Sequence, residues 1–549
     1  MTDEIIRKIL EVRGIVSEED VREFLSERPK LTHDPLLIPG MEEGTEFLLG
    51  ALSEGKHICV YGDYDVDGMC GTAILVSFLR EAARLLCSGS KVTYYIPSRI
   101  EEGYSLNESA IRTILNDGAD VILTVDCGSV SAREAAYARE LGLDIVITDH
   151  HDPDPGKLPD CILINPKLKT EDGGYPFEML AGAGVAFKLC AALLTRMGVE
   201  DRSMLNDMID LVSVATIADV MPLIDENRTL VKYGLARLRK SARPAFNALL
   251  NVSGTEPLNL SVRDVAFVIS PRLNALGRLG DANEAVEFFL TDSDARMKKI
   301  AGNMDRLNTE RRKMQEKCFR ECMELARTGS YFLVLKPADS HEGVAGIVAG
   351  KVREETGLPC AVLTESQDEG LLKGSVRSAG RLDVTSLLRK HEGLFERLGG
   401  HAAAAGFTID HKNEEVLREA LSAAVAEMLE EDPGLLDESE EAELEIETGD
   451  VGEELAVAIE SLAPFGVGNP SPALLISVPA EKITGIRTMG QEEKHLRFTA
   501  DGISCVFFNG AKTRFPDEGT ALITGCPEIN VWNGMRNIQF AVRHVDVLR

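Results

Sequence analysis

The sequence lacks the features that are typical of basic nucleic-acid-binding proteins, membrane proteins and secreted proteins. It has no excess of positive charge, because 59 Lys and Arg stand against 89 Asp and Glu, giving a formal net charge of −30. Long-range attraction therefore does not bring a polyanion to the chain as a whole. No apolar run approaches the ~18 residues that a membrane span requires, and the N-terminus lacks the residue order of a signal peptide. We expect a cytoplasmic protein that does not bind a membrane.

The sequence also lacks the cysteine pairs of zinc clusters and the motifs of two common enzyme classes. The eleven cysteines include no CxxC pair, and the two nearest, Cys318 and Cys322, are four residues apart. A zinc cluster has no support, and scattered thiols in apolar settings indicate a reducing cytosol. The sequence has neither the GxSxG of esterases nor the GxxxxGK[ST] of P-loop NTPases. Both of those enzyme classes are set aside.

The length and composition indicate a folded chain of several domains. With 549 residues, 44% hydrophobic and 27% charged, the chain should form three or four domains at about 150 residues each. Short apolar runs that alternate with helical segments predict buried parallel strands near residues 56–62, 91–97, 119–128, 143–151 and 160–166. The predicted divisions are a helical lead-in (1–40), an α/β domain (41–225), a helical connecting region with a long charged helix (226–330), a second α/β domain (331–430), an acidic linker (431–450) and a small β-barrel (451–549).

Three carboxylates crowd the loop that follows the first predicted strand. Asp63, Asp65 and Asp67 lie in the segment GDYDVDG, ahead of an apolar helix. Like charges this close repel unless they are neutralised, and divalent cations held by Asp oxygens are the usual solution. The alternative is an acidic turn without a ligand. A calcium-binding EF-hand loop is excluded, because its twelfth position, counted from Asp63, is Ile74 rather than Glu.

Further acids and histidines end other elements. Asp126 follows an apolar strand, where it could also cap a helix. Asp149, His150 and His151 end the next strand, and Asp219 lies in an apolar segment where an unpaired charge would be costly. Because the ligand crevice of a parallel sheet lies at the carboxyl ends of its strands, these groups should gather there. Oxygen and nitrogen ligands without thiolates predict two Mn²⁺ or Mg²⁺ ions and hydrolysis of a phosphoester or phosphoanhydride.

The order of the motifs resembles a known family. DYDVDG, VDCG, TDHH and ATIADVMPL, followed by GGHAAAAGF, are similar to the DHH phosphoesterase superfamily, and within it to the RecJ family of single-strand-specific exonucleases. The resemblance extends over nearly the whole chain. Its further motifs are HDPLLIPGM (33–41), IPSRIEEGYSL (96–106), ISPRLNALGRLGDA (269–282), HEGVAGIVAGK (341–351), GSVRS (374–378) and PFGVGNPSP (464–472).

The resemblance implies roles for the acids and histidines. His151 would face the scissile phosphate, Asp126 would bridge two metals, and Asp63 would be a metal ligand or a base. The implied metal ligands are Asp65, Asp67, Asp126, His150 and Asp219. The family also implies that 41–225 is a DHH domain, that 331–430 is a DHHA1 domain in which Gly399, Gly400 and His401 close over the substrate, and that 451–549 is an OB-fold holding single-stranded DNA.

Several polar residues fit the recognition of a phosphate chain. Arg99 follows a strand, and Ser375 and Arg377 lie in a predicted Gly-flanked turn, where a hydroxyl and guanidinium forks suit a terminal phosphate. They resemble the family's pocket for a 5′-phosphate. A predicted loop carries the candidate DNA contacts Arg272, Asn274 and Arg278. For each arginine the alternative is a surface ion pair. The barrel's candidates, of which many aromatics are expected in the core, are Arg487, Lys494, Arg497, Phe498, Phe507, Phe508, Lys512, Trp532 and Arg536.

These features lead to one predicted function and to stated alternatives. We expect a 5′-to-3′ exonuclease that hydrolyses single-stranded DNA to 5′-mononucleotides in DNA repair and recombination, with two Mn²⁺ ions, or Mg²⁺, as cofactors. The polarity comes from the resemblance alone. The alternatives are a DHH phosphodiesterase of 3′-to-5′ polarity or with RNA or oligonucleotide preference, and a non-catalytic Cdc45-like replication scaffold. The expected partners are single-stranded DNA and, among proteins, single-strand-binding protein or replication and repair factors. The expected state is a monomer.

Overall fold

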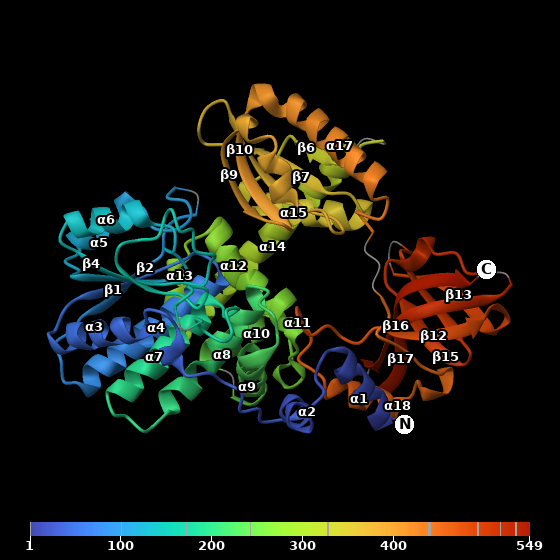
Figure 1. Cartoon of the computed structure of the whole chain (residues 1–549), viewed down its shortest axis with the longest axis horizontal. Helices are drawn as coiled ribbons and strands as arrows, with labels where there is room; N and C mark the ends of the chain where they lie inside the picture. The colour runs from blue at the N-terminus through green and yellow to red at the C-terminus, as the bar shows by residue number, and fades with distance from the viewer. Residues whose placement is uncertain are drawn as a thin grey trace. The chain divides into compact units, whose positions relative to one another are not determined.

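The structure is a computed structural model, and its chain divides into two compact units. The first unit comprises Met1–Ser270, Ala285–Met297 and Glu440–Arg549, and the second comprises Pro271–Glu284 and Lys298–Ser439 (Figure 1). No helix among the described residues has the length and apolar character that crossing a bilayer demands. The structure describes residues 2–99, 101–171, 173–241, 243–326, 329–437, 441–490, 493–516, 518–532 and 535–548.

The first unit contains a sheet of five parallel strands in the order β2-β1-β3-β4-β5. β1 and β3 are buried along their whole length, as expected for the central strands of a covered parallel sheet. Gly62 at the end of β1 pairs with Val125 at the end of β3, so the loops after these two strands leave the sheet side by side. The bounds are β1 (Ile58–Gly62), β2 (Val92–Tyr95), β3 (Val121–Val125), β4 (Asp144–Thr148) and β5 (Ile162–Ile164).

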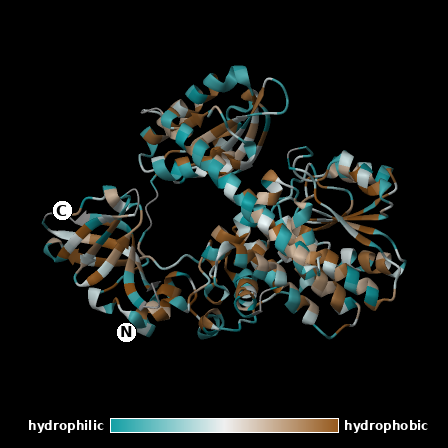
Figure 2. Cartoon of the chain, turned by 180° about the vertical axis from the view of Figure 1, so that it is seen from behind, coloured by the Kyte–Doolittle hydropathy of each residue, from teal (hydrophilic) through white to brown (hydrophobic). Residues whose placement is uncertain are grey.

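Helices cover both faces of this sheet (Figure 1). α5 (Glu108–Asn116) and α6 (Ala132–Glu140) share a core with the residues that point to one face, such as Tyr61 and Ile122. On the other face α4 (Val66–Leu85) packs against α7 (Gly182–Arg196) and α8 (Ser203–Ala218). The strands are largely brown in Figure 2, where brown is hydrophobic. The remaining helices of this part are α2 (Glu18–Leu25), α3 (Met41–Ser53), α9 (Asp225–Ser241), α10 (Pro244–Ser253), α11 (Val262–Asp264) and α13 (Asn283–Leu290).

The second unit is built on a mixed sheet in the order β6-β7-β8-β10-β9. Its first two strands are parallel and the other pairs are antiparallel. The long helix α14 (Asp294–Leu325) precedes the sheet, and its last turns pack on β6, β7 and α15 through Cys318 and Cys322. The other elements are α12 (Ser270–Leu279), β6 (Leu333–Leu335), α15 (Glu342–Thr356), β7 (Cys360–Glu365), β8 (Leu371–Arg377), α16 (Val384–Arg389), β9 (Phe395–His401), β10 (Ala404–Asp410) and α17 (Glu414–Glu431).

The third sheet belongs to the first unit and has the order β11-β12-β16-β17-β15-β14-β13. Because only η7 (Ala480–Lys482) separates β12 from β13, the two sides of the sheet are linked as in a small barrel. α1 (Thr2–Val12) and α18 (Glu453–Glu460) contribute Ile9, Leu10 and Leu455 to its core. The strands are β11 (Leu444–Glu445), β12 (Leu474–Pro479), β13 (Ile483–Met489), β14 (His495–Ala500), β15 (Ile503–Phe507), β16 (Thr520–Trp532) and β17 (Met535–Leu548).

The predicted fold class is confirmed. A parallel-sheet α/β domain, a long helix, a second α/β domain and an OB-type barrel follow one another along the chain. The predicted acidic linker contributes β11, which pairs with β12, so this part of it belongs to the third sheet.

Candidate active site

The site begins where β1 ends. Asp63 is the first residue after the strand, and its side chain is only 4% exposed. Asp65 is the N-cap of α4, and its Oδ1 accepts hydrogen bonds from the backbone N–H groups of Asp67 (2.9 Å) and Gly68 (3.1 Å). A Cβ at Gly68 would lie 2.5 Å from the backbone of Asp63, so only glycine permits this turn. The acidic loop is therefore folded by its own capping interactions and glycine.

Asp67 is fixed by a second helix. Its two carboxylate oxygens accept the backbone N–H groups of Gly182 (2.6 Å) and Ala183 (2.7 Å) at the start of α7. This pairing satisfies two of the free N–H groups at the helix N-terminus and places a negative charge at its positive end. Gly182 is required here, because a Cβ would lie 2.7 Å from the Cβ of Asp126. The first turns of α4 and α7 thus carry the acids into one buried space.

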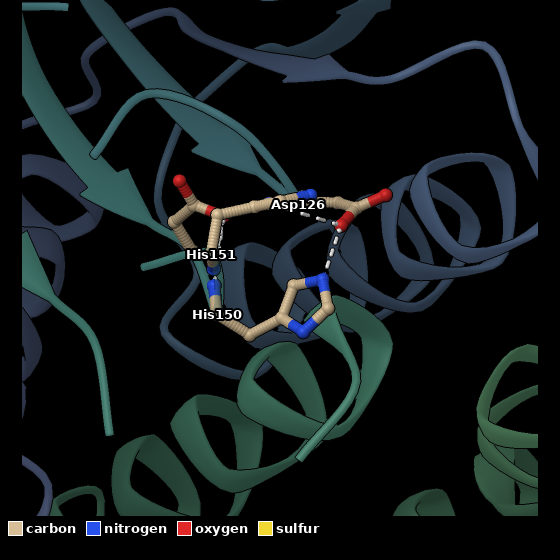
Figure 3. Close-up of side chains that lie close together, drawn as sticks. Asp126, His150 and His151 are labelled. Atoms are coloured by element: carbon tan, nitrogen blue, oxygen red, sulfur yellow. Dashed lines mark hydrogen bonds and ion pairs between the residues drawn. The ribbon is translucent and has the colours of Figure 1, made fainter. Parts of the chain in front are cut away.

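The neighbouring strands β3 and β4 bring the next acid and the two histidines. Asp126 directly follows β3 and adopts φ of +65°, a conformation that Asp tolerates better than most residues. Its backbone N–H donates to the carbonyl of Thr148 at the end of β4 (3.1 Å). Asp149, His150 and His151 directly follow that strand, so the two histidines emerge beside Asp126 at the same sheet edge (Figure 3).

His150 lies at the centre of the acids. Its Nε2 is 3.0 Å from Asp126 Oδ1, 3.6 Å from Asp219 Oδ2 and 3.7 Å from Asp67 Oδ2. Asp219 is the C-cap residue of α8, so a helix from a distant part of the sequence completes the cluster. The predicted ligands Asp65, Asp67, Asp126, His150 and Asp219 are thereby brought together, along with Asp63.

The carboxylates strongly perturb one another. Burial, reinforced by the charge of Asp65, raises the pKa of Asp67 to about 7. Burial and the charges of Asp67 and Asp65 raise the pKa of Asp219 to about 9. The pKa values of Asp63 and Asp126 are also raised, mainly by burial. Crowded acids in an apolar site resist ionisation unless a cation compensates their charge.

The donor set fits divalent metal ions. Among the described residues, Asp63 Oδ1, Asp219 Oδ2 and both ring nitrogens of His150 are buried without a hydrogen-bond partner. Burial lowers the pKa of His150 to about 3, so the ring is neutral and its lone pair is free for a metal. The ligand atoms lie within 4.8 Å of one another within each of three groups, which are Asp126, Asp149, His150 and His151, then Asp67, His150 and Asp219, and then Asp63, Asp65 and Asp126. Carboxylate oxygens with one imidazole suit Mn²⁺ or Mg²⁺.

His151 has a different environment from His150. Asp149 Oδ1 lies 2.8 Å from His151 Nδ1, and Asp149 also accepts the backbone N–H of Ser129 (2.8 Å). Burial alone would lower the pKa of His151, but the bond to Asp149 raises it to about 9. The same bond keeps the pKa of Asp149 below its usual value despite complete burial. One histidine is thus neutral and the next is held as a cation.

An aromatic chain that the sequence did not predict extends from this cation. The ring of Tyr104 meets His151 edge-on at 5.7 Å, and its hydroxyl is 3.2 Å from His151 Nε2. Tyr64 meets Tyr104 at 6.4 Å, and the guanidinium of Arg99 lies 5.1 Å above Tyr64. Tyr104 is 48% exposed. The tyrosine in the motif IPSRIEEGYSL was the signal available in the sequence.

The substrate-side residues of the second unit form a separate group. Ser375 and Arg377 lie on β8, not in the predicted turn, because residues 371–377 alternate between buried and partly exposed positions and pair with β7 and β10. Two residues apart, they share a face of the strand. A Cβ at Gly346 of α15 would lie 3.3 Å from Arg377 Nη2. His401 is the exposed last residue of β9.

The predicted loop around Arg272, Asn274 and Arg278 is wrong. These residues lie on helix α12, because Leu273 and Leu276 recur at helical spacing and are fully buried, which outweighs the glycine in the helix. Arg272 pairs with Asp305 of α14 (2.9 Å), and Arg278 donates to the carbonyl of Gly343 (2.8 Å). Asn274 is partly exposed.

Some of the candidate DNA-binding residues of the barrel lie in its core and others lie on its surface. Phe498 is buried and Phe507 packs partly against the core, whereas Phe508 is 54% exposed. Arg497 and Ser504 line a polar cavity of about 380 Å³ with four residues of the β16–β17 hairpin, Asn530, Asn537, Ile538 and Gln539. The other exposed candidates are Arg487, Lys494, Lys512 and Arg536, and the side chain of Trp532 lies outside the described residues.

A parallel sheet that gathers acids and histidine at its strand ends, followed by a mixed α/β domain, defines a DHH-type phosphoesterase. The family model described as the DHH family N-terminal domain matches residues 57–216, the DHHA1 domain matches 329–430, and the RecJ OB domain matches 442–544. The chain belongs to the RecJ family of single-stranded-DNA-specific exonucleases.

Relatives over nearly the full length support this membership. RecJ of Bacillus subtilis is 33% identical over 99% of this chain and 68% of its own length. RecJ of Thermus thermophilus is 36% identical over 97% of this chain and 74% of its own. RecJ of Escherichia coli is 30% identical over 98% of this chain and 95% of its own.

Solved structures agree with the sequence comparison. The crystal structure of Thermus thermophilus RecJ in complex with Mn²⁺ has a TM-score of 0.82 at 31% identity, covering 99% of this chain and 76% of that one. The crystal structure of the same protein in complex with Mg²⁺ has a TM-score of 0.77 at 29% identity, covering 99% of this chain and 74% of that one. This one relative was thus crystallised with each of the two metals that the donor set of this chain suits.

Proposed function

We propose that this chain is a metal-dependent exonuclease that hydrolyses single-stranded DNA from its 5′ end to 5′-mononucleotides, in DNA repair and recombination. One observation carries the proposal: the carboxylates of Asp67, Asp126 and Asp219 converge on the neutral ring of His150, and Asp65 lies in a group with Asp126. A DHH-type site in a member of the RecJ family, whose curated relatives are named single-stranded-DNA-specific exonucleases, makes a DNA strand the substrate.

The five residues would hold two Mn²⁺ ions, or Mg²⁺. When bound, such ions polarise a phosphoryl oxygen and lower the pKa of water, so that water becomes a nucleophile at neutral pH. Asp67 and Asp65 accept backbone hydrogen bonds that fix their orientation before any ion arrives. Asp63 would serve as an additional ligand or as a base for the attacking water.

The chain's own groups act on the phosphate. His151, held as a cation by Asp149, would donate a hydrogen bond to a non-bridging oxygen of the scissile phosphate and stabilise its developing charge. Water adds to phosphorus, and the bond from phosphorus to the 3′-oxygen of the terminal nucleotide breaks. That oxygen leaves as a hydroxyl, and the shortened strand again carries a 5′-phosphate. The exposed ring of Tyr104 beside His151 offers a surface on which a base can stack.

Other parts of the chain would hold the strand. Ser375 and Arg377 on β8 would bind the terminal phosphate, and Arg99 and His401 would contact the substrate. Arg272, Asn274 and Arg278 on α12 would contact the DNA backbone, and the polar cavity beside Arg497 would bind the strand on the barrel. We further propose that the protein is a monomer in the cytoplasm, in keeping with eleven free cysteines. Single-strand-binding protein and repair factors remain the proposed protein partners.

A digestion time course with Mn²⁺ tests the proposal. The substrates are single-stranded DNA labelled at the 5′ or the 3′ end, the matching RNA, and duplex DNA. We expect immediate release of a labelled mononucleotide from the 5′-labelled single-stranded DNA and from no other substrate. The Asp126→Ala variant should release none. Release from the 3′ label or preference for RNA would overturn the polarity or the substrate. Absence of hydrolysis both with Mn²⁺ and in a repeat with Mg²⁺ would overturn the enzymatic function.

A further inference from the structure

The motif around residues 464–472 has no place in the mechanism described so far. We name residues 463–470 the strap. It lies between α18 and β12 and joins none of the described strands, although one bridge pairs Gly466 with Asn469. Its residues pack on a different domain, against the segment that follows α8 in the catalytic part of the chain.

The strap is in close contact with residues 219–225, which we name the Asp219 loop. The backbone N–H of Leu223 donates to the carbonyl of Val467 at 2.7 Å. A Cβ at Gly466 would lie 2.8 Å from Leu223 Cδ1, and one at Gly468 would lie 3.1 Å from Pro222 Cβ. The two glycines therefore leave no free space between the strap and the loop.

The Asp219 loop adopts an unfavourable backbone conformation. Val220 has φ of +58°, which is rare for a β-branched residue, and Asp225 has φ of +48°. Conformations of this kind persist only where the surrounding structure enforces them. Leu223, in the middle of the loop, is 2% exposed. The strap supplies both the backbone hydrogen bond and the packing at this residue.

The strap is itself held firmly. Asn469 is 2% exposed, and its Nδ2 donates to the carbonyls of Leu462 (2.9 Å) and Pro464 (2.8 Å). Arg13 Nη1 donates to Asn469 Oδ1 at 2.6 Å. Arg228 Nη2 adds a bond to the carbonyl of Ala463 at 2.9 Å. The conformation of the strap is thus fixed by its own hydrogen bonds and does not depend on the Asp219 loop alone.

We infer that the strap is a positioning element for Asp219, so that the segment preceding the barrel completes the metal site of the catalytic domain. This inference rests on the proposed function only in taking Asp219 as a metal ligand. The contrast with Asp67 supports it. Asp67 is oriented by two backbone hydrogen bonds, whereas Asp219 Oδ2 has no hydrogen-bond partner among the described residues. Asp219 is the C-cap residue of α8, and the loop that follows it is tied to the same turn, because the backbone N–H of Met221 donates to the carbonyl of Thr216 at 3.1 Å.

Mn²⁺ affinity of the metal-free full-length chain, measured by titration calorimetry, tests the inference. Leu223→Ala removes the side chain that the strap packs against, and Asn469→Asp replaces the two donated bonds of the strap with a carboxylate of the same shape. Both variants should weaken Mn²⁺ binding about 10- to 100-fold, the usual effect of losing groups that orient metal ligands. Leu238→Ala, at a fully buried leucine of α9 outside the strap contact, controls for general destabilisation.

The controls separate positioning from stability. Asp219→Asn gives the loss of Mn²⁺ affinity expected when the ligand itself is removed. Thermal unfolding without metal shows whether Leu223→Ala and Leu238→Ala lose the same amount of stability. Leu223→Val replaces Leu223→Ala if the latter does not fold. Wild-type Mn²⁺ affinity in the strap variants, or an equal loss in Leu238→Ala, would overturn the inference. A wild-type chain that binds Mn²⁺ through Asp219 but degrades no DNA would refute the proposed function and leave the positioning role standing.

Discussion

The carboxylate of Asp149 holds the ring of His151, with Oδ1 2.8 Å from Nδ1. Asp149 is buried and is itself fixed by the backbone N–H groups of Ser129 and His150. The carboxylate therefore sets both the tautomer and the direction of the histidine, whose other nitrogen, Nε2, lies 3.2 Å from the hydroxyl of Tyr104. Both oxygens of Asp149 already accept these hydrogen bonds, so we expect it to act through His151.

The first prediction concerns this pair. We expect Asp149→Asn to lower kcat by about 10- to 100-fold, as for other groups that orient an active-site histidine. His151→Gln should lower kcat further, because the charged donor to the phosphate is lost. The double variant should be no slower than His151→Gln alone, since Asp149 has no role without the ring. Single-turnover cleavage of 5′-labelled single-stranded DNA measures the three rates. Additive losses would contradict the pairing.

The second prediction concerns the repulsion among the acids. Asp126→Asn removes one buried charge while keeping the shape of the side chain and the φ of +65°, which Asn also tolerates. Without metal, the variant should be more stable than the wild type by about 1 kcal/mol or more, since one pKa unit corresponds to about 1.4 kcal/mol. With Mn²⁺ the order should reverse, because only the wild type binds the ion well. Thermal unfolding with EDTA and with Mn²⁺ measures both.

The sequence predicted the parts of the site that depend on local pattern. Asp63, Asp126 and His150 were found because each follows a short apolar strand, and the carboxyl ends of parallel strands meet at one edge. The orientation of Asp67 by the start of α7 was not predictable, because it joins groups 115 residues apart along the chain. Asp219 was predicted from its apolar setting, but its position at the end of a helix was not.

Two errors have a common physical origin. Glycine around Arg278 and Ser375 indicated loops, yet the residues form α12 and β8. In each case the apolar neighbours are buried at the spacing of a helix or a strand, and tertiary packing outweighs the local preference of glycine. The strap escaped detection for a related reason. Its glycines make room for Leu223 of another domain, and this contact has no signature in the local sequence.

The third prediction uses two glycines of α7. A Cβ at Gly182 would lie 2.9 Å from Asp126 Cα, so Gly182→Ala should displace Asp126 or the helix. We expect a loss of stability of about 1–3 kcal/mol and at least a 10-fold weaker affinity for Mn²⁺. Gly184→Ala is the matched control on the same helix, because its Cβ would first meet Leu180 at 3.4 Å. Equal behaviour of the two variants in calorimetric Mn²⁺ titration would exclude this steric account.

The last prediction concerns the terminal phosphate. No carboxylate among the described residues pairs with Arg377, and burial with the nearby Arg353 lowers its pKa, so an anion would be favoured beside it. If it binds the 5′-phosphate, Arg377→Ala should slow cleavage of 5′-phosphorylated strands by roughly 10- to 100-fold, the value of a charge-assisted hydrogen bond. Strands with a 5′-hydroxyl lack the group and should be cleaved at the wild-type rate for that substrate.

Two further variants make this test specific. Arg381→Ala removes an exposed arginine that pairs with Asp432, and it should leave the preference for the phosphate unchanged. Arg377→Lys keeps the charge but loses the planar fork, so it should recover only part of the rate. The ratio of kcat/KM for the two kinds of strand is the quantity compared. An equal loss on both strands in Arg377→Ala would mean that the arginine supports the fold of β8 and α15, since Gly346 leaves room for its guanidinium on the helix.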